Sequence, residues 1–250
     1  MHHLLVYTKL QAASASLAAL TALTDPAVPQ DQNGRYILPT QWKLLTAAGF
    51  GVNLSALQIN SPYFRRTFLP GIWPLNGSNT PTTAALISDY REYPMTLPAL
   101  EGIEIDASNS DTVTHQATAG LFISDMPIQP IQGGEVYSLA FTGAVTATAN
   151  AFVSGNFTFS QTLPQGTYAV VGGAFYSATG MFARLILPGQ AYRPGFFCSS
   201  AVTNATPWQG RKQPMGNMGQ FQSTALPQFE IYCSAADTSQ TGFLDLVKIA

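Results

Sequence analysis

Residues 135–189 of this chain read EVYSLAFTGAVTATANAFVSGNFTFSQTLPQGTYAVVGGAFYSATGMFARLILPG, and this stretch decides the fold class. Over more than fifty residues it holds only two charged side chains, Glu135 and Arg184, and glycines divide it into segments of strand length. The segments are rich in β-branched and aromatic residues, which suit a pleated, half-buried surface. Residues 168–172 are continuously apolar, whereas residues 136–141 partly alternate. The stretch therefore predicts the main sheet of an all-β sandwich.

The composition of the whole chain points to a surface made for contact. The 250 residues are enough for one large β-domain or two small ones. Only 10% of them are charged, against about 25% in an average soluble domain. Uncharged polar residues must therefore cover much of the surface, and depletion of charge is a feature of interface cores. This favours a protein that assembles with other subunits, the alternative being a weakly charged secreted β-protein.

The basic residues are too dispersed for a nucleic-acid-binding protein. The net charge is −2, and the only adjacent basic pairs are Arg65 with Arg66 and Arg211 with Lys212. Because a protein that binds the phosphates of nucleic acid usually carries a basic patch or arm, we expect no strong direct nucleic-acid binding. The first residues have neither a basic segment followed by an apolar run of signal-peptide length nor a membrane span, which predicts synthesis in the cytoplasm of the producing cell.

The N-terminal region suggests a short helical arm within residues 1–30. Residues 9–23 place Leu10, Leu17 and Leu20 near one helical face, and Pro26 ends the pattern. The small, weakly amphipathic surface predicts an arm that becomes ordered against the protein body or a neighbouring subunit. The three leucines are therefore candidate interface residues. A further one or two helical turns are expected at residues 41–48.

A boundary between two β-modules is expected near residues 126–134, MPIQPIQGG, because prolines and a glycine pair interrupt the pattern. The modules would cover residues 31–127 and 128–250. A faint internal echo supports them: Thr-Leu-Pro occurs at residues 96–98 before the strand GIEID and at residues 162–164 before GTYAVVGG. In GIEID, the alternation places isoleucines inward and acidic residues outward.

A long loop at residues 188–227 is rich in Gly, Pro, Asn and Gln. A loop of this length in a compact domain is usually functional or packed against a partner. It also carries aromatic, basic and flexible thioether side chains, which suit an adaptable contact surface. Its candidate interface residues are Trp208, Arg211, Lys212, Met215 and Met218.

No catalytic motif accompanies this pattern, so we expect no enzyme and no cofactor. A nucleophile site would have to rest on His115, which we interpret as a sheet-surface residue. Glu104 and Asp106 would project from one sheet face about 7 Å apart, a spacing open to a hydrolytic pair, although a solvated face is the favoured interpretation. No metal site is predicted beyond a weak Ca²⁺ candidate formed by Asp106 and Asp111.

The two cysteines, Cys198 and Cys233, have no neighbouring ligand at metal-binding spacing. Two buried free thiols are the favoured interpretation, and a single disulfide is the alternative.

In overall character, the chain resembles the jelly-roll coat proteins of icosahedral viruses and phages. The features that carry the resemblance are the charge-poor β-rich sequence, the small-residue N-terminal segment, the Pro/Gly-rich connections and the absence of catalytic equipment. The resemblance implies a jelly-roll β-sandwich, and the faint echo favours two tandem modules, a double jelly roll. It also implies trimeric or pentameric capsomers within a larger shell, other virion proteins as partners and a location in the virion. The absent basic arm would suit a shell over an internal membrane or another protein layer.

The alternative function is a carbohydrate-binding β-sandwich, such as a lectin or a phage receptor-binding module. It predicts a small soluble oligomer and a groove lined by tryptophan, with Trp208 as the candidate platform. It also allows Ca²⁺ at the turn of residues 106–111.

Overall fold

The protein is described here by a computed structural model covering residues 1–12, 14–67, 72–73, 75–76, 87–127, 131, 133–199 and 216–250. The chain forms two compact units. Unit 1 comprises Met1–His3, Thr80–Ala84 and Pro127–Ala250, and unit 2 comprises Leu4–Asn79 and Ala85–Met126. The main change from one unit to the other falls between Met126 and Pro127. Each unit has its own sheets and its own core.

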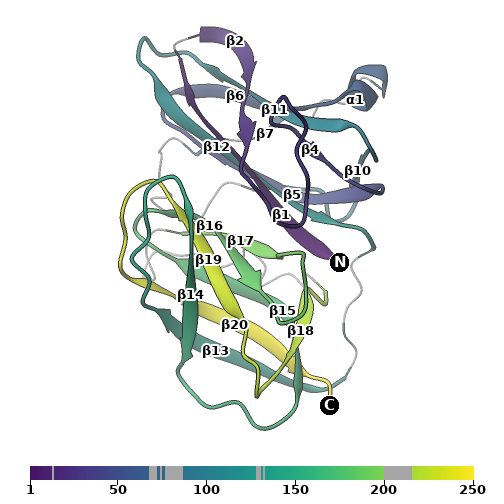
Figure 1. Ribbon diagram of the computed structural model, residues 1–250, viewed down its shortest axis with the longest axis vertical. Coiled ribbons are helices and arrows are strands. Elements are labelled where there is room, and N and C mark those ends of the chain that lie inside the picture. The colour runs from purple at the N-terminus through teal and green to yellow at the C-terminus, as the bar shows by residue number, and fades with distance from the viewer. Residues whose placement is uncertain are drawn as a thin grey trace. The chain divides into compact units, whose positions relative to one another are not determined.

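Unit 1 contains eight strands that hydrogen-bond in the order β17-β16-β19-β14-β13-β20-β15-β18 (Figure 1). In chain order they are β13 (Glu135–Gly143), β14 (Phe152–Phe159), β15 (Thr167–Tyr176), β16 (Gly180–Ile186), β17 (Gly195–Phe197), β18 (Gly219–Gln222), β19 (Gln228–Cys233) and β20 (Gln240–Lys248).

The pairing in unit 1 is that of a jelly roll. The first strand pairs with the eighth, the second with the seventh, the third with the sixth and the fourth with the fifth, as in one long hairpin that turns between β16 and β17. The hairpin is also rolled up, because β20 pairs with β15 and β19 pairs with β16. This gives two four-stranded halves, β13-β20-β15-β18 and β17-β16-β19-β14, which are linked by a short pairing between β13 and β14.

Aromatic side chains fill the space between the two halves of unit 1. Phe141 and Phe175 come from one half, and their ring centroids are 4.7 Å apart. Phe157 and Phe229 come from the other half, with centroids 5.0 Å apart. The two pairs meet, since Phe141 and Phe157 lie 4.7 Å apart with their rings nearly perpendicular. Such edge-to-face packing is favourable beyond the area it buries, and it holds the two halves together.

Unit 2 contains the same strand pairing in a different sequence. Its eight jelly-roll strands are β1 (His2–Gln11), β2 (Ser14–Ala19), β5 (Trp42–Phe50), β6 (Leu54–Asn60), β7 (Ile72–Trp73), β10 (Met95–Leu97), β11 (Gly102–Asn109) and β12 (His115–Ser124). One half has the order β1-β12-β5-β10 and the other β2-β11-β6-β7. The first strand again pairs with the eighth, the second with the seventh, the third with the sixth and the fourth with the fifth.

The chain is thus all-β and consists of two tandem jelly rolls, with one short helix, α1 (Pro62–Thr67), among the described residues. Shorter strands extend the sheets of unit 2. They are β3 (Thr21–Ala22), β4 (Tyr36–Ile37), β8 (Leu75–Asn76) and β9 (Ile87–Asp89), which pair with β1, β11, β5 and β5.

The prediction of a helical N-terminal arm is wrong. Residues 9–23 instead contribute the end of β1, all of β2 and β3, and β2 pairs with β11 through Ala18 and Ala107. The proposed helical face is not buried as one surface, because Leu10 is 66% exposed while Leu20 is 2% exposed. Small residues have only a weak preference for a helix, and hydrogen bonding to neighbouring strands overrides that preference.

Two other expectations are corrected by the strand pairing. Residues 42–48 belong to strand β5 rather than to a helix. Their side chains from Leu44 onward are buried on both faces, which removes the alternating pattern typical of a half-buried strand. The sequence echo also fails as a guide to the repeat. It aligns β11 with β15, but these strands are the seventh of one jelly roll and the third of the other.

Candidate interaction surfaces

The predicted interface residues of the N-terminal region lie in different environments. Leu10 at the end of β1 and Leu17 on β2 are exposed, at 66% and 44%. Leu20 is buried, and its backbone N–H donates to the carbonyl of Ile105 at 2.7 Å. The first two could contact a partner, whereas Leu20 belongs to the core of unit 2.

The predicted interface residues of the long loop fall mostly on positions that lie outside the described residues, namely Trp208, Arg211, Lys212 and Met215. Met218 is described and is 2% exposed. It forms part of the wall of a cavity of about 380 Å³ in unit 1.

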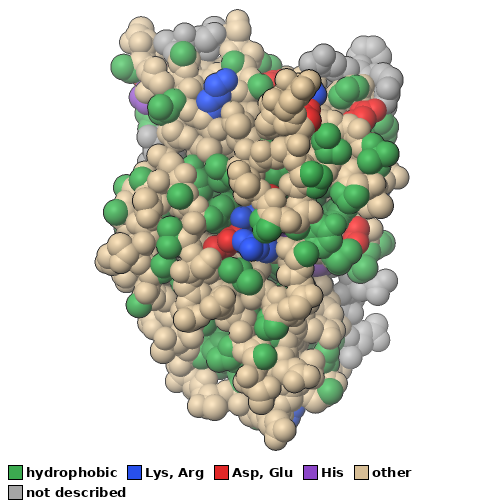
Figure 2. Space-filling model, viewed as in Figure 1, with side chains coloured by type: hydrophobic (Ala, Val, Ile, Leu, Met, Phe, Trp, Pro, Cys, Tyr) green, Lys and Arg blue, Asp and Glu red, His purple; other side chains and the backbone are tan. Residues whose placement is uncertain are grey.

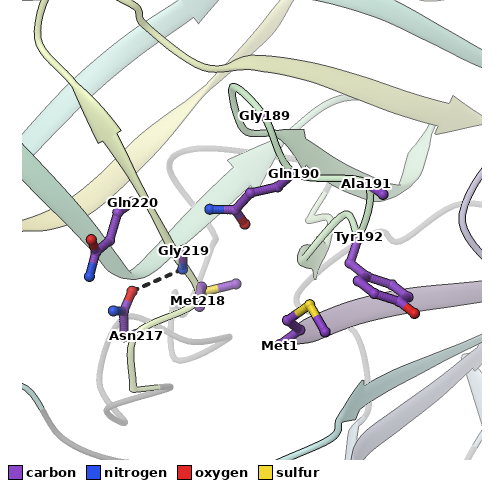
Figure 3. A pocket seen from close by; sticks show the side chains of 9 residues that line it. All are labelled: Met1, Gly189, Gln190, Ala191, Tyr192, Asn217, Met218, Gly219 and Gln220. Atoms are coloured by element: carbon purple, nitrogen blue, oxygen red, sulfur yellow. Dashed lines mark hydrogen bonds between the residues drawn. The ribbon is translucent and has the colours of Figure 1, made fainter. Parts of the chain in front are cut away.

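Figure 3 shows that this cavity is lined by the loop that follows β16 and by the residues that lead into β18. Gln190, Asn217 and Gln220 contribute amides, while Met1, Tyr192 and Met218 contribute apolar surface. The Asn217 side-chain oxygen accepts a hydrogen bond from the Gly219 N–H at 3.0 Å, which fixes this part of the wall. The lining can take apolar and amide groups, and it holds no carboxylate side chain.

A buried charge cluster lies on the half of unit 1 formed by β17-β16-β19-β14. Arg184 on β16 pairs in register with Glu230 on β19, and their side chains form an ion pair although they are 2% and 3% exposed. Arg193 forms a second ion pair with the other carboxylate oxygen of Glu230. The Arg184 guanidinium also lies 3.9 Å from the ring centroid of Phe152, in cation–π contact.

His3 lies beside this cluster within unit 1. It is fully buried, and its Nδ1 accepts a hydrogen bond from the Arg193 N–H at 2.8 Å. The ring of Tyr192 meets that of His3 edge-on at 5.7 Å. The loop that carries Arg193 is therefore fixed at its backbone as well as at its charged end.

Sequence reasoning missed this cluster, although a signal was available. Arg184 is the only charged residue of β16, and Glu230 is the only charged residue of β19. A single charge within an otherwise apolar strand predicts a partner on a neighbouring strand, because an unpaired buried charge is costly. The partner could not be identified without knowing the pairing of β16 with β19.

A second cavity, of about 330 Å³, lies on unit 1. It is at the end of the pairing between β16 and β19, where Ile186 lies opposite Gln228. Asn156 and Gln228 form one side, and their amides join through a 2.7 Å hydrogen bond. Ile186, Leu226 and Pro227 supply apolar surface, and no charged residue lines it. This cavity is suited to an apolar side chain rather than to a charged ligand.

The Ca²⁺ candidates have other partners. Asp106 is 8% exposed and accepts a hydrogen bond from the Asn60 amide at 3.0 Å. Asp111 contacts His115 Nε2 at 2.9 Å and Asn53 Nδ2 at 2.6 Å, and it also accepts from Thr112. The hydrogen bond with His115, followed by those with Asn53 and Thr112, lowers the pKa of Asp111. Across the described ranges, no group of three or more His, Cys, Asp and Glu residues could hold a metal.

The two cysteines are buried free thiols. Cys198 follows β17 and its N–H donates to Met181, whereas Cys233 pairs with Gly180, so they lie on opposite sides of β16. Two strand spacings, roughly 10 Å, separate them, which exceeds the reach of a disulfide. Burial raises the pKa of Cys233 to about 11 and that of Cys198 well above its ordinary value.

The visible surface is poor in charge. Figure 2 shows a face covered mainly by uncharged groups, with scattered hydrophobic side chains and few acidic or basic ones. Large hydrophobic side chains that are exposed in the described part of the chain are Met1, Leu10, Leu17, Tyr93, Leu100, Val113, Met126, Val136, Leu226 and Ile249. By contrast, Trp42 is buried, with 1% of its surface exposed.

Within the described ranges, no helix has the length and apolar character needed to cross a membrane. No protein-family model and no curated protein matches the chain. A structure search found the crystal structure of the STIV MCP, a viral major capsid protein, at 9% sequence identity and a TM-score of 0.26, with 97% of each chain covered. A likeness this weak carries no argument, so the jelly-roll assignment rests on the strand pairing itself.

Proposed function

We propose that this protein is a structural capsid subunit of a virus or phage, which assembles with copies of itself into capsomers and a shell. The tandem jelly rolls support this function, since jelly rolls build both viral capsids and lectins. Because a fold does not by itself imply a function, the choice between these two depends on the surface.

The observation that carries the proposal is the shortage of unpaired charge. Charged residues make up 10% of the sequence. Several of those described are neutralised within the chain, as in the pairs of Arg35 with Asp31 and Arg91 with Asp89, and in the buried cluster of Glu230. A free monomer usually relies on a charged surface to stay soluble and separate. A chain with so little surface charge offers weak electrostatic repulsion between copies.

In this function the protein works through geometry rather than through chemistry. Heterologous contacts between copies close into rings and shells, and many modest contacts together give a stable assembly. We propose trimeric or pentameric capsomers, a location in the virion and contacts with other virion proteins. A membrane or a protein layer beneath the shell would suit a chain that has no basic arm, and the proposal includes neither strong nucleic-acid binding nor catalysis.

The test is the size distribution of the purified untagged protein, measured by sedimentation velocity across a range of salt concentrations and pH, with negative-stain images of the same samples. Capsomers or megadalton particles are expected. A monodisperse monomer or dimer under all conditions would overturn the proposal. In that case, screening on a glycan array, with Trp208→Ala as the matched variant, would test the carbohydrate-binding alternative.

A further inference from the structure

The cavity of about 380 Å³ in unit 1 has a wall that combines amides with apolar groups. None of the described residues that line it has a charged side chain, and the amino group of Met1 is the one charge they carry. The volume lies at the small end of the range of about 300–1,000 Å³ in which proteins bind small molecules. The cavity therefore suits a small, neutral ligand.

Two glutamine side chains at this cavity have no hydrogen-bond partner within the described part of the chain. Gln190 lies in the loop after β16 and Gln220 lies on β18, and both are exposed. Each side-chain amide offers two donor hydrogens and one acceptor oxygen. A ligand that both donates and accepts hydrogen bonds can therefore use both amides in place of water.

The Gln190 amide lies over the backbone of Gly219, toward which its side chain extends from the loop (Figure 3). A Cβ added at Gly219 would lie 2.9 Å from Gln190 Oε1 and 3.3 Å from Gln190 Nε2. It would also lie 2.2 Å from Leu187 Cδ1. Glycine at this position therefore makes room for the amide, and the two walls of the cavity approach each other there.

Tyr192 and Met218 supply apolar surface to the same cavity. The Tyr192 ring is half-buried, and the edge-on contact with His3 fixes its orientation. An aromatic ring can contact the C–H groups of a sugar while amides bind its hydroxyls. A purely apolar ligand, by contrast, would cover the two glutamines and leave them without hydrogen bonds, which is costly.

We propose that this cavity binds a neutral sugar, in the form of one or two hexose units of a glycan. Sugar hydroxyls both donate and accept hydrogen bonds, as the amides of Gln190 and Gln220 do. A peptide is the less favoured ligand, because its main chain would pair with the backbone of an edge strand, whereas the unpaired groups identified here are side-chain amides.

The sugar site is independent of self-assembly, because all of its lining residues belong to unit 1 of one chain. For a shell subunit, it adds a second function, which is recognition of a glycosylated surface. Many copies in one shell would bind such a surface much more strongly than a single site does.

The first test identifies the ligand by saturation-transfer difference NMR on the full chain. The probes are glucose, galactose, mannose, N-acetylglucosamine and their disaccharides, and the comparison ligands are glucuronic acid and short uncharged peptides. Saturation transfer to at least one neutral sugar is expected. A response from glucuronic acid alone, from the peptides alone or from none of the ligands would overturn the inference.

The second test assigns the site with Gln190→Ala and Gln220→Ala. Each variant is expected to weaken binding of the sugar by about three- to tenfold, because it removes hydrogen bonds between neutral groups. The melting temperature should stay unchanged, since both side chains are exposed and without partners in the described structure. Gln222→Ala is the matched control, because Gln222 is an exposed glutamine of the same strand that does not line the cavity.

Equal affinity of the wild type and the double variant Gln190→Ala with Gln220→Ala would overturn the assignment of the cavity. Sedimentation velocity on the same samples separates this inference from the proposed function. The double variant is expected to assemble as the wild type does. A wild type that binds the sugar but never associates would support the sugar site and overturn self-assembly.

Discussion

Arg184 and Glu230 lie opposite each other on β16 and β19 and form an ion pair in which both side chains are almost fully buried. Arg193 binds the same carboxylate from a loop. Two guanidinium groups therefore bind one carboxylate, so the loss of Glu230 would remove an ion-pair partner from both arginines.

Glu230→Gln is expected to lower the free energy of unfolding by about 3–5 kcal/mol, because it removes the carboxylate that compensates the buried Arg184 charge. The joint replacement Arg184→Met with Glu230→Leu should cost much less, since it removes both charges and fills similar volume. Urea unfolding followed by fluorescence measures both. Asp31→Asn, which breaks the more exposed pair with Arg35, is the control and should cost less than about 1 kcal/mol. Equal losses for Glu230→Gln and Asp31→Asn would contradict the assigned role.

Gly242 on β20 faces Phe141 on one neighbouring strand and Phe175 on the other. A Cβ there would lie 2.0 Å from the Ala174 carbonyl oxygen and 2.5 Å from the Phe141 ring. Gly242→Ala should therefore destabilise the protein by about 1–3 kcal/mol through overpacking. Thermal unfolding tests this, with the exposed Thr142→Ala on β13 as the control, and an unchanged melting temperature for Gly242→Ala would contradict the tight packing.

The thiols of Cys198 and Cys233 should resist modification in the folded protein, because burial raises the pKa of both and the thiolate is the reactive form. Incubation with a maleimide near neutral pH is expected to label neither, and both should be labelled after denaturation. Mass spectrometry counts the labels. Rapid labelling of either cysteine in the native protein would show that the sheet around β16 opens readily.

Stability should fall in acid partly through Asp111. The pKa of this carboxyl is lower in the folded protein than in the unfolded chain, chiefly because of His115, so the unfolded chain takes up the proton more readily. The contribution is complete above the ordinary pKa of 3.8 and is lost as the pH falls toward the lowered value. Asp111→Asn should flatten this part of the profile when urea unfolding is compared between about pH 5 and about pH 2. An identical slope in wild type and Asp111→Asn would contradict the prediction.

The strands were predictable where the sequence alternates or is continuously β-branched. Ile103 and Ile105 are fully buried as expected, and residues 168–172 lie within β15. The expected solvated face of the same strand is wrong at Asp106, which is 8% exposed and accepts a hydrogen bond from Asn60. The N-terminal strands were missed because alanine, serine and leucine fit a helical period as well as an extended one. Only their pairing with β11 and β1 decides between the two structures.

The candidate surfaces were less predictable than the fold class. The residues around Leu100 do not predict its left-handed backbone conformation. That conformation is accompanied by hydrogen bonds of Leu100 and Glu101 to the distant Leu38 and Tyr63. Likewise, the contact of Arg184 with Glu230 depends on the register of two strands that are joined by a long connection. Such features arise from tertiary pairing, which a local pattern does not encode.

The nested pairing of the strands sets an order for folding during translation. All eight jelly-roll strands of unit 2 precede β13, so this unit can complete its sheets while unit 1 is still being synthesised. Both units close over a long stretch of chain, since β1 pairs with β12 in unit 2 and Glu135 pairs with Lys248, more than one hundred residues later, in unit 1. Until the ribosome has released β20, β13 therefore has only its short pairing with β14 available. Long-range closure of this kind is slow, and unit 1, which is synthesised after unit 2, is expected to close last.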